Sequence, residues 1–296
     1  MVKLDCIYNE DCLQGLKKVQ SNSVDAVITD PPYNIGKDSW DRIDNYCDWF
    51  LSVVKECSRV LKDNGTFWFF HMDFDILSKL HNRIIYETSF RHKQMIIIDK
   101  GKQSIAGRTS DMLRSYPRAT EYLQFYFSDN NKFIRNFLKE NRKKSGLTIK
   151  QVANSLGIYQ AMYGFFEQNN SCPRIPTEEQ WNKLKKLFDF DLDYLKVKYY
   201  FKPCFGFTDV WRVNFYKEKN NGHCTQKPLS LMHRIIKTAT KQGMVVCDPF
   251  IGSGSTALAC KQLRRHFIGF EIDKEYYDIS LKRLLNVPRR LEEFQT

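Results

Sequence analysis

The sequence predicts an α/β fold into which an all-helical module is inserted. Apolar segments of strand length alternate with helical patterns in the first 130 of the 296 residues, and the alternation returns after residue 200. Such alternation is typical of a largely parallel sheet that carries helices on both faces. Residues 131–200 contain helical patterns and no convincing strand. We therefore expect one discontinuous α/β domain, 1–130 and 201–296, around a helical domain at 131–200.

The elements of the α/β domain are predicted from short apolar runs and from helical spacing. Residues 45–61 place Trp49, Phe50 and other apolar side chains at helical spacing, and Asn64-Gly65 is expected to end this helix. A further helix is expected at 255–263. The expected strands are 23–29, 66–70, 95–98, 122–127, 207–215, 245–248 and 266–270. Ligands of such sheets lie beyond the carboxyl ends of strands, which makes the residues that follow a strand the functional candidates.

The helical module is predicted from apolar spacing together with helix-capping residues. Thr177, with Gln180 three residues later, has the pattern of a capping box, and Gly157 closes another helix. The expected helices span 133–144, 148–156, 158–168 and 177–188. We expect them to form a compact unit.

The composition favours a basic intracellular protein. The formal net charge is +12 and the pI about 9.2, which predicts attraction to a polyanion such as a nucleic acid. The nine cysteines are scattered without a Cys-x-x-Cys pair, so reduced thiols and no metal site are expected. The sequence shows neither a signal peptide nor a segment long enough to span a membrane. A cytoplasmic protein is the expectation.

Residues 248–256 form a glycine-rich segment between a predicted strand and a predicted helix. Gly252 and Gly254 let the backbone turn tightly and approach a ligand closely. Glu271 ends the next strand, and an acid about 20 residues after such a turn can accept hydrogen bonds from ribose hydroxyls. The turn therefore predicts a nucleoside cofactor. It also fits the dinucleotide form Gly-x-Gly-x-x-Ala, whereas the P-loop pattern is absent.

The segment Asp30-Pro31-Pro32-Tyr33 follows another predicted strand and suits a flat base that carries an exocyclic amine. The prolines stiffen the backbone, so the Asp30 carboxylate and a proline carbonyl can act as two fixed acceptors. Two acceptors on its hydrogens free the lone pair of an aromatic amine to attack a sulfonium methyl group, without a metal. Tyr33 offers a stacking face worth about 1–3 kcal/mol per base, and a duplex base must be flipped out to reach it. A rigid turn that merely closes the strand is the alternative.

These two segments resemble motifs of the amino-methyltransferases of restriction–modification systems. Asp30-Pro31-Pro32-Tyr33 matches the catalytic motif of that family, and residues 248–256 match its cofactor motif. Residues 225–228 (Thr-Gln-Lys-Pro) and 9–13 (Asn-Glu-Asp-Cys-Leu) are similar to two further segments of the family. The catalytic motif precedes the cofactor motif, which is the order found in the β class of these enzymes.

The resemblance covers residues 4–130 and 205–285 and implies a Rossmann-like, S-adenosylmethionine-dependent methyltransferase fold. It implies S-adenosylmethionine as the methyl donor, with Glu271 on its ribose and Asp11 near its adenine. It also places Asp30 and the Pro31 carbonyl on the target amine. The implied catalytic residues are Asp30, Pro31, Pro32 and Tyr33. The implied cofactor-binding residues are Asp11, Cys12, Asp30, Lys227, Pro228, Asp248, Pro249, Phe250, Gly252, Gly254, Ser255, Thr256, Glu271 and Asp273.

The first residue of the catalytic motif favours adenine as the target. Family members with Asp at this position mostly methylate adenine N6, those with Ser mostly methylate cytosine N4, and protein-glutamine methylases usually carry Asn. We therefore expect a site-specific adenine-N6 methyltransferase that acts on double-stranded DNA in the bacterial nucleoid. Cytosine N4, RNA methylation and a DNA-binding regulator on an inactive fold stay open. A cognate restriction endonuclease and a homodimer stay open as partners.

The helical module resembles the helix-turn-helix of Cro/C1-type repressors over residues 146–192, with departures at Ile149 and Asn169. In such modules the second helix enters the major groove. Here it is the predicted helix 158–168, whose early residues Tyr159, Gln160 and Ala161 are expected to be exposed, and Gln can pair with adenine edges. The DNA contacts expected are Arg142, Lys143, Lys144, Tyr159 and Gln160. A helical unit that only packs on the enzyme is the alternative.

Overall fold

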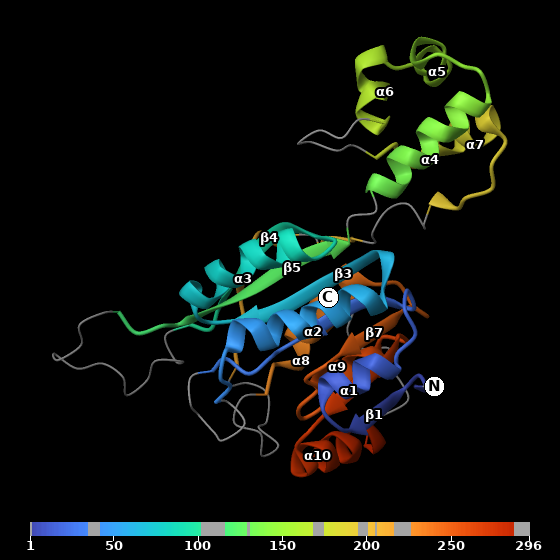
Figure 1. Cartoon of the computed structure of the whole chain (residues 1–296). Coiled ribbons are helices and arrows are strands. Elements are labelled where there is room, and N and C mark those ends of the chain that lie inside the picture. Colours follow the sequence, from blue (N-terminus) through green and yellow to red (C-terminus); the bar gives the residue numbers. More distant parts are fainter. Residues whose placement is uncertain are drawn as a thin grey trace. The chain divides into compact units, whose positions relative to one another are not determined.

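The computed structural model describes residues 2–34, 42–101, 116–128, 131–167, 175–194, 201–204, 206–215 and 226–286 (Figure 1). The chain divides into two compact units. Met1–Ser128 and Tyr200–Thr296 together form an α/β unit, and Asp129–Tyr199 forms a helical unit.

A mixed sheet organises the described part of the α/β unit, with the strand order β1-β8-β7-β2-β3-β5-β4-β6. The strands are β1 (Cys6–Asn9), β2 (Val24–Thr29), β3 (Leu61–His71), β4 (Phe90–Asp99), β5 (Thr120–Ser128), β6 (Val210–Arg212), β7 (Val245–Asp248) and β8 (His266–Glu271). Strand β5 runs antiparallel to both β3 and β4, and the other neighbouring pairs are parallel. The expected α/β fold with a largely parallel sheet is therefore confirmed.

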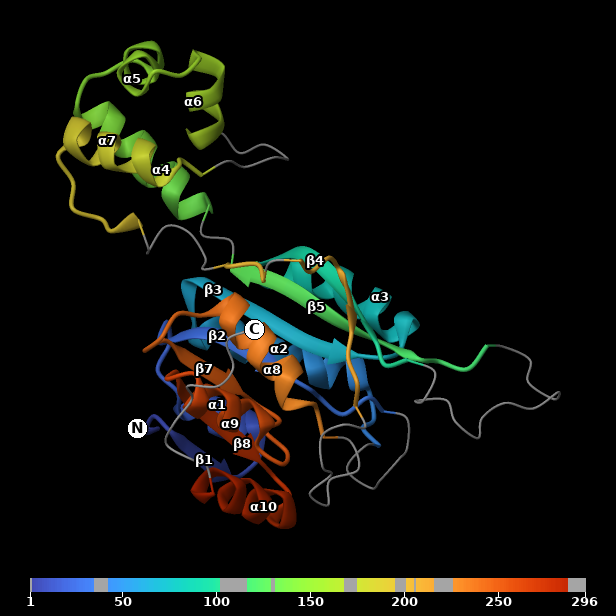
Figure 2. The same cartoon turned by 180° about the vertical axis from the view of Figure 1, so that it is seen from behind.

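Helices cover both faces of this sheet. On one face α1 packs on α2 and α2 on α3 (Figure 1), and on the other face α8 packs on α9 (Figure 2). Helix α10 contacts α9 and the edge strand β1. The helices are α1 (Cys12–Lys18), α2 (Tyr46–Val60), α3 (Phe74–Glu87), α8 (Leu229–Ala239), α9 (Ser255–Gln262) and α10 (Lys274–Leu285). Parallel strands need crossover connections, and all of these helices except α10, which follows the last strand, lie between successive strands of the chain.

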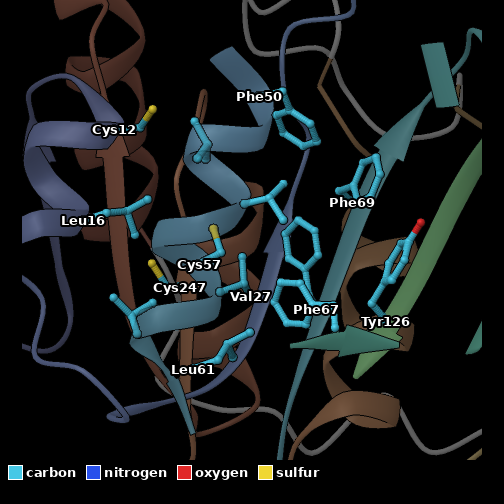
Figure 3. Close-up of a cluster of buried hydrophobic side chains, with 14 of the residues drawn as sticks. Cys12, Leu16, Val27, Phe50, Cys57, Leu61, Phe67, Phe69, Tyr126 and Cys247 are labelled. Carbon is cyan, nitrogen blue, oxygen red and sulfur yellow. The ribbon is translucent and has the colours of Figure 1, made fainter. Parts of the chain in front are cut away.

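The core between the sheet and helices α1 to α3 is rich in aromatic side chains (Figure 3). Phe50 and Cys57 of α2 are fully buried, and Phe67 and Phe69 of β3 belong to the same cluster, as does Leu16 of α1. The ring centroids of Phe50 and Phe69 are 5.1 Å apart. Helix α2 repeats its apolar residues at helical spacing, so burying one face removes a continuous apolar stripe from water.

The junction between α2 and β3 differs from the sequence expectation. Helix α2 ends at Val60, and β3 begins at once with Leu61, which pairs with Val24 of β2. Asn64-Gly65 therefore lies inside the strand, and the prediction that it ends the helix is wrong. The register shifts between Val24 and Ala26, so the extra residues of β3 are taken up as an irregularity in the pairing.

Strand β1 and helices α1, α3 and α10 lie outside the elements predicted from sequence. Helix α3 buries Leu77, Leu80 and Ile84 at helical spacing, so a periodic signal is present in its sequence. Helix α10 buries only Ser280. Its apolar side chains, such as Tyr277, Leu281 and Leu284, are only half-buried.

The helical unit contains four described helices around its own core. They are α4 (Asn131–Lys144), α5 (Ile149–Leu156), α6 (Gln160–Glu167) and α7 (Glu178–Phe188). The capping box predicted at Thr177 and Gln180 is present, and Gly157 ends α5 with a φ of 70°. Leu138, Val152, Tyr163, Trp181 and Leu184 are among the buried core residues. Helix α6 ends at Glu167, and Gln168 and Asn169 lie outside the described residues.

Gly15 allows α1 to approach β8 closely, and we expect Gly15→Ala to destabilise the α/β unit. A Cβ atom at this position overlaps the ring of Phe270. Overpacking of this kind costs about 1–3 kcal/mol, which exceeds the roughly 1 kcal/mol by which alanine improves on glycine in a helix. Urea denaturation of wild type and variant measures the loss.

The control for Gly15→Ala is the double variant that also carries Phe270→Leu. If the ring is the obstacle, the alanine costs less in the Phe270→Leu background than in wild type, and the two changes are non-additive. Equal costs in both backgrounds would show that the helix–strand contact does not limit the residue at position 15.

Candidate active site

The two sequence motifs meet at the carboxyl edge of the sheet. Strands β2 and β7 are parallel neighbours, with Val27 opposite Cys247. Asp30 directly follows β2, and Asp248 is the last residue of β7. The hydroxyl of Thr29 donates a hydrogen bond to Asp248 Oδ1 at 2.7 Å, across 219 residues of sequence. The fold thus joins the two segments into one site.

Asp248 is buried and shapes the turn that follows it. Its carboxylate accepts hydrogen bonds from the hydroxyls of Thr29 at 2.7 Å and Thr256 at 2.5 Å, and from the backbone N–H of Phe250 at 3.1 Å. Burial raises the pKa of Asp248 to about 7, against the lowering effect of these hydrogen bonds. Asp248 therefore ties β2, the turn and α9 together.

The glycine turn is fastened to the end of β8. Gly252 and Gly254 have φ angles of 52° and 83°, in the left-handed region that glycine favours. The N–H of Gly252 donates to Glu271 Oε2 at 2.9 Å, and the N–H of Asp273 donates to Oε1 at 2.8 Å. Burial raises the pKa of Glu271. A carboxylate has about four acceptor positions, so Glu271 can still accept hydrogen bonds from two hydroxyls.

Asp11 and Cys12 lie beside Glu271 because β1 pairs with β8. Asn9 Nδ2 donates to the Glu271 carbonyl oxygen at 2.8 Å. Asp11 caps α1 and accepts a hydrogen bond from the N–H of Gln14 at 3.1 Å. Cys12 is buried, which raises its pKa to about 12, so its thiol stays protonated in the core. The structure thus gathers the predicted acids Asp11 and Glu271 at one end of neighbouring strands.

A pocket opens between the two motifs. Its lining residues are Thr29, Asp30, Phe70, Gln226, Lys227, Met232, Asp248, Phe250, Ile251, Ser253, Ser255 and Thr256. Pro249 is buried behind this lining, and Pro228 and Asp273 cap α8 and α10. Hydroxyl-bearing and apolar residues, among them Ile251 and Ser253 beside Gly252, therefore line one space, which suits a nucleoside cofactor. Thr225, which belongs to the predicted Thr-Gln-Lys-Pro segment, lies outside the described residues.

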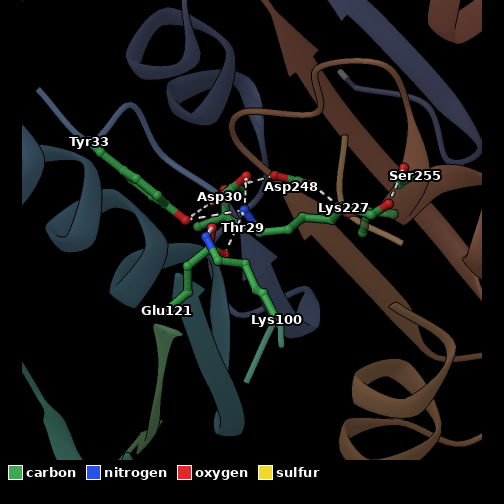
Figure 4. A network of polar contacts seen from close by, with 9 residues as sticks. Thr29, Asp30, Tyr33, Lys100, Glu121, Lys227, Asp248 and Ser255 are labelled. Carbon is green, nitrogen blue, oxygen red and sulfur yellow. Dashed lines mark hydrogen bonds and ion pairs between the residues drawn. The ribbon is translucent and has the colours of Figure 1, made fainter. Parts of the chain in front are cut away.

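Both carboxylate oxygens of Asp30 are engaged (Figure 4). Lys227 Nζ donates to Oδ2 at 2.6 Å, and the Tyr33 hydroxyl donates to Oδ1 at 2.7 Å. Burial raises the pKa of Tyr33 well above its usual value, so the hydroxyl remains a donor. Pro31 is buried, and the Pro32 carbonyl accepts a hydrogen bond from Tyr46 of α2 at 2.7 Å. The segment is therefore held from both sides.

Glu121 and Lys100 belong to the same network and were not among the predicted site residues. Lys227 Nζ lies 3.3 Å from Glu121 Oε2, and Lys100 Nζ donates to Glu121 Oε1 at 2.9 Å. Glu121 is 7% exposed in an otherwise largely apolar strand. A lone acid in a buried strand is the sequence signal that could have identified it, since such a charge needs a partner. Lys227, expected only at the cofactor, contacts the catalytic motif directly.

Four of the five predicted DNA contacts are exposed on the helical unit. Lys143 and Lys144 are exposed at the end of α4. Tyr159 is 84% exposed and precedes α6, and Gln160 is exposed as the first residue of that helix. Ala161 is exposed next to them.

Arg142 makes contacts within the helical unit. Its guanidinium donates to both carboxylate oxygens of Glu167, at 2.8 and 2.9 Å, and to the Leu147 carbonyl at 3.1 Å. The Arg142 side chain is 15% exposed. These donors fasten α4 to α6 and to the start of α5, and the contact of Arg142 with DNA phosphate stays a prediction.

No group of three or more His, Cys, Asp or Glu residues that could hold a metal ion occurs in the described parts of the chain. Within those same ranges, no helix combines the length and apolar character needed to cross a membrane.

Comparison with known proteins identifies the family. Residues 24–282 match a family model described as DNA methylase, and the chain belongs to this family. It is similar to the type II methyltransferase M.HindIII of Haemophilus influenzae, with 25% identity over 323 residues that cover 95% of both chains. It is also similar to the DNA adenine methyltransferase YhdJ of Escherichia coli, with 27% identity over 284 residues, 94% of this chain and 82% of that one.

A solved structure shares the fold. The crystal structure of an M1.HpyAVI–SAM complex matches with a TM-score of 0.59 and 22% identity, and it covers 95% of this chain and 98% of that one. The predicted Rossmann-like methyltransferase fold class is thereby confirmed.

The buried Asp248 predicts a specific pH dependence of stability. Its native pKa of about 7 exceeds the ordinary value of 3.8, so between these pH values the native state binds a proton that the unfolded chain releases. The free energy of unfolding therefore falls as the pH rises from about 4 to about 7, by at most roughly 4 kcal/mol from this group.

Denaturation of wild type and Asp248→Asn across pH 4.5–8 tests this dependence. We expect the stability advantage of wild type over the variant to shrink as the pH rises through this window. An advantage that stays constant with pH would mean that the Asp248 carboxyl is ionised throughout it.

Proposed function

We propose that this chain is a site-specific DNA methyltransferase that moves a methyl group from S-adenosylmethionine to adenine N6 of a flipped base. The observation that carries the proposal is the junction at the edge of β2 and β7. There Asp30 and the glycine turn line the same cavity. Membership of the DNA methylase family supports the same assignment.

Asp30 and its neighbours are proposed to bind and orient the target amine. The Asp30 carboxylate and the Pro31 carbonyl each accept one of the amine hydrogens, which localises the nitrogen lone pair. Tyr33 supplies the stacking face for the flipped base. The proton that leaves the methylated nitrogen passes to Asp30 or to water, since the carboxylate already accepts its hydrogen bond. Holding the amine and the methyl donor in the right geometry accounts for much of the rate enhancement, as in other transfers between bound groups.

The residues around the cavity fit S-adenosylmethionine, which supplies an electrophilic sulfonium methyl group when bound. Glu271 would accept the ribose hydroxyls, and Asp11 would lie near the adenine. The glycine turn of 252–254 would allow the backbone to approach the nucleoside, because Cβ atoms are missing at its two glycines. The name of the M1.HpyAVI–SAM structure, which shares this fold, supports the same cofactor.

Adenine is proposed as the target because Asp30 begins the catalytic motif, and the similar protein YhdJ is named a DNA adenine methyltransferase. A role in a restriction–modification system is supported by the similar type II enzyme M.HindIII. A cognate endonuclease and a homodimer stay predictions from the resemblance, and nucleoid association follows from the net charge of +12.

The helical unit, assigned to residues 131–200, is proposed as a helix-turn-helix that contributes to target recognition. Support comes from α5 and α6, which follow each other through Gly157, and from the exposure of Tyr159 and Gln160 at the start of α6. In a helix-turn-helix, these positions face the major groove. Lys143 and Lys144 are then placed to contact phosphates.

Asp30→Ala should abolish DNA methylation. Sequencing that detects modified bases, in DNA from cells that express each variant, is expected to find methylated adenine at one short motif for wild type only. Loss of the acceptor lowers turnover by about 10²-fold or more. Duplex affinity should stay within about threefold, because affinity comes mainly from phosphate contacts.

The other outcomes are distinct from one another. Methylation that persists in Asp30→Ala contradicts the catalytic assignment. Modified cytosine in the wild-type sample keeps the mechanism and overturns the choice of base. Wild type without any modified DNA base favours an RNA substrate or a regulator.

Gln160→Ala should relax sequence preference, whereas Lys144→Ala should weaken binding to every duplex. A bidentate side chain–base pair contributes about 1–3 kcal/mol of discrimination, and a phosphate contact contributes none. Methylation rates on cognate and single-mismatch duplexes, with salt titrations of binding, distinguish the two effects. Lys144→Ala should reduce the salt slope by about 1. Equal losses on all sequences for Gln160→Ala would refute base recognition by that residue.

A further inference from the structure

Four side chains of alternating charge form a continuous line from the catalytic motif into the sheet (Figure 4). Asp30 contacts Lys227 at 2.6 Å, Lys227 contacts Glu121 at 3.3 Å, and Glu121 contacts Lys100 at 2.9 Å. They come from the end of β2, the segment before α8, strand β5 and the end of β4. Side-chain exposure is 7% for Lys227 and 9% for Glu121, so the middle of this line is shielded from water.

Each buried charge in the line depends on its neighbours. Burial alone lowers the pKa of Lys227, but the carboxylates of Asp30 and Glu121 outweigh this effect and raise it above its usual value. For Glu121, burial alone raises the pKa. The ammonium groups of Lys227 and Lys100 outweigh this effect and lower the pKa below its usual value. Lys227 and Glu121 are therefore both ionised at neutral pH. Along the line the formal charges alternate in sign, and those of the four side chains sum to zero.

Lys227 fixes the direction in which Asp30 presents its oxygens. Its ammonium donates to Oδ2, while the Tyr33 hydroxyl donates to Oδ1. Two donors on different oxygens leave the carboxylate little freedom to rotate. Since a carboxylate has about four acceptor positions, each oxygen can still accept a hydrogen from a target amine. The Lys227 ammonium also lies 4.9 Å from the centroid of the Phe70 ring, which adds a favourable cation–π contact.

We propose that Lys227 is a positioning residue of the methyl-transfer site, with Glu121 as its anchor. The ammonium orients the Asp30 carboxylate and keeps it in the acceptor form that the target amine needs. Lys100 in turn neutralises Glu121. This inference rests on the proposed function, because it assigns to Lys227 and Glu121 a role in the reaction that starts at Asp30.

The charge of Lys227 should appear in the pH dependence of the reaction. Among the described residues, the titratable groups around Asp30 are Lys227, Tyr33, Glu121, Asp248, Tyr46 and His71. Lys227 is the nearest cation, at 2.6 Å. Its removal takes the positive charge away from the Asp30 acceptor. The acid limb of the kcat profile should therefore move to higher pH by about one unit or more, as expected when an adjacent opposite charge is lost.

Lys227→Met is the direct test, since methionine keeps most of the side-chain length without the charge. We expect kcat to fall about 100-fold and the acid limb to move to higher pH. The Kd for S-adenosylmethionine, measured by calorimetry without DNA, should stay within about threefold. In Lys227→Arg the acid limb should remain at the wild-type position even where kcat is reduced, because the charge is kept.

Two further variants serve as controls: one removes an unrelated Lys–Asp ion pair, and the other tests the same charge line without changing Lys227. Lys62→Met removes another Lys–Asp ion pair, 2.7 Å long, from Asp25 near the opposite end of β2, and should change neither kcat nor the pH profile. Glu121→Gln leaves the Lys227–Asp30 contact in place but removes its anchor. It should lower kcat about tenfold because Lys227 loses its anchor. It should move the acid limb to lower pH, opposite to Lys227→Met, because a like charge near Asp30 is lost, and this result can be measured even if Lys227→Met fails to fold.

The outcomes separate this inference from the proposed function. Wild type that methylates no duplex contradicts the proposed function itself. Active wild type, together with an unmoved acid limb in both Lys227→Met and Glu121→Gln, overturns the positioning role. More than tenfold weaker S-adenosylmethionine binding at unchanged kcat also overturns it, and would assign Lys227 to the cofactor alone.

Discussion

The site depends on the buried Asp248 carboxylate between strands β2 and β7. It accepts hydrogen bonds from Thr29 at the end of β2, from Thr256 in α9 and from the backbone of the turn. Two segments far apart in sequence are thereby held at one edge of the sheet. A buried acid costs free energy unless its oxygens accept hydrogen bonds. These three donors therefore stabilise Asp248 at its buried position. Loss of this arrangement would separate the glycine turn from Asp30.

A second layer of ionic contacts supports the catalytic motif. Asp30 lies at the exposed end of a line of charges whose inner members, Lys227 and Glu121, are shielded from water. Burying any one of these ions alone would cost desolvation free energy. Attraction between neighbours of opposite charge offsets that cost. Buried ion pairs add little net stability for this reason. They define geometry instead, which suits the role of amine acceptor proposed for Asp30.

Sequence reasoning succeeded where the signal is local and was incomplete where contacts are distant. A strand, a glycine turn and a helix follow one another in the chain, so the fold class and the two motifs could be recognised from residue order. The Asp30–Lys227 contact joins positions 197 residues apart, and its anchor Glu121 lies on a third segment. Likewise, the periodicity of α4 predicted the helix but not the partner of Arg142. That side chain donates to Glu167, which lies 25 residues later in the chain. The start of β3 was misplaced because pairing with β2 overrides the turn preference of Asn64-Gly65.

Among the described residues, the α/β unit and the helical unit have separate cores. The cluster under α2 and the cluster of the helical unit have no residue in common, so each unit buries its own apolar surface. Tyr159 and Gln160 are exposed on the helical unit and belong to neither core. Substitutions at such positions change the surface without disturbing packing, whereas changes near Asp30 disturb a closed set of charges. If the helical unit reads DNA, target sequence can therefore vary through exposed side chains while the acceptor geometry at Asp30 stays constant.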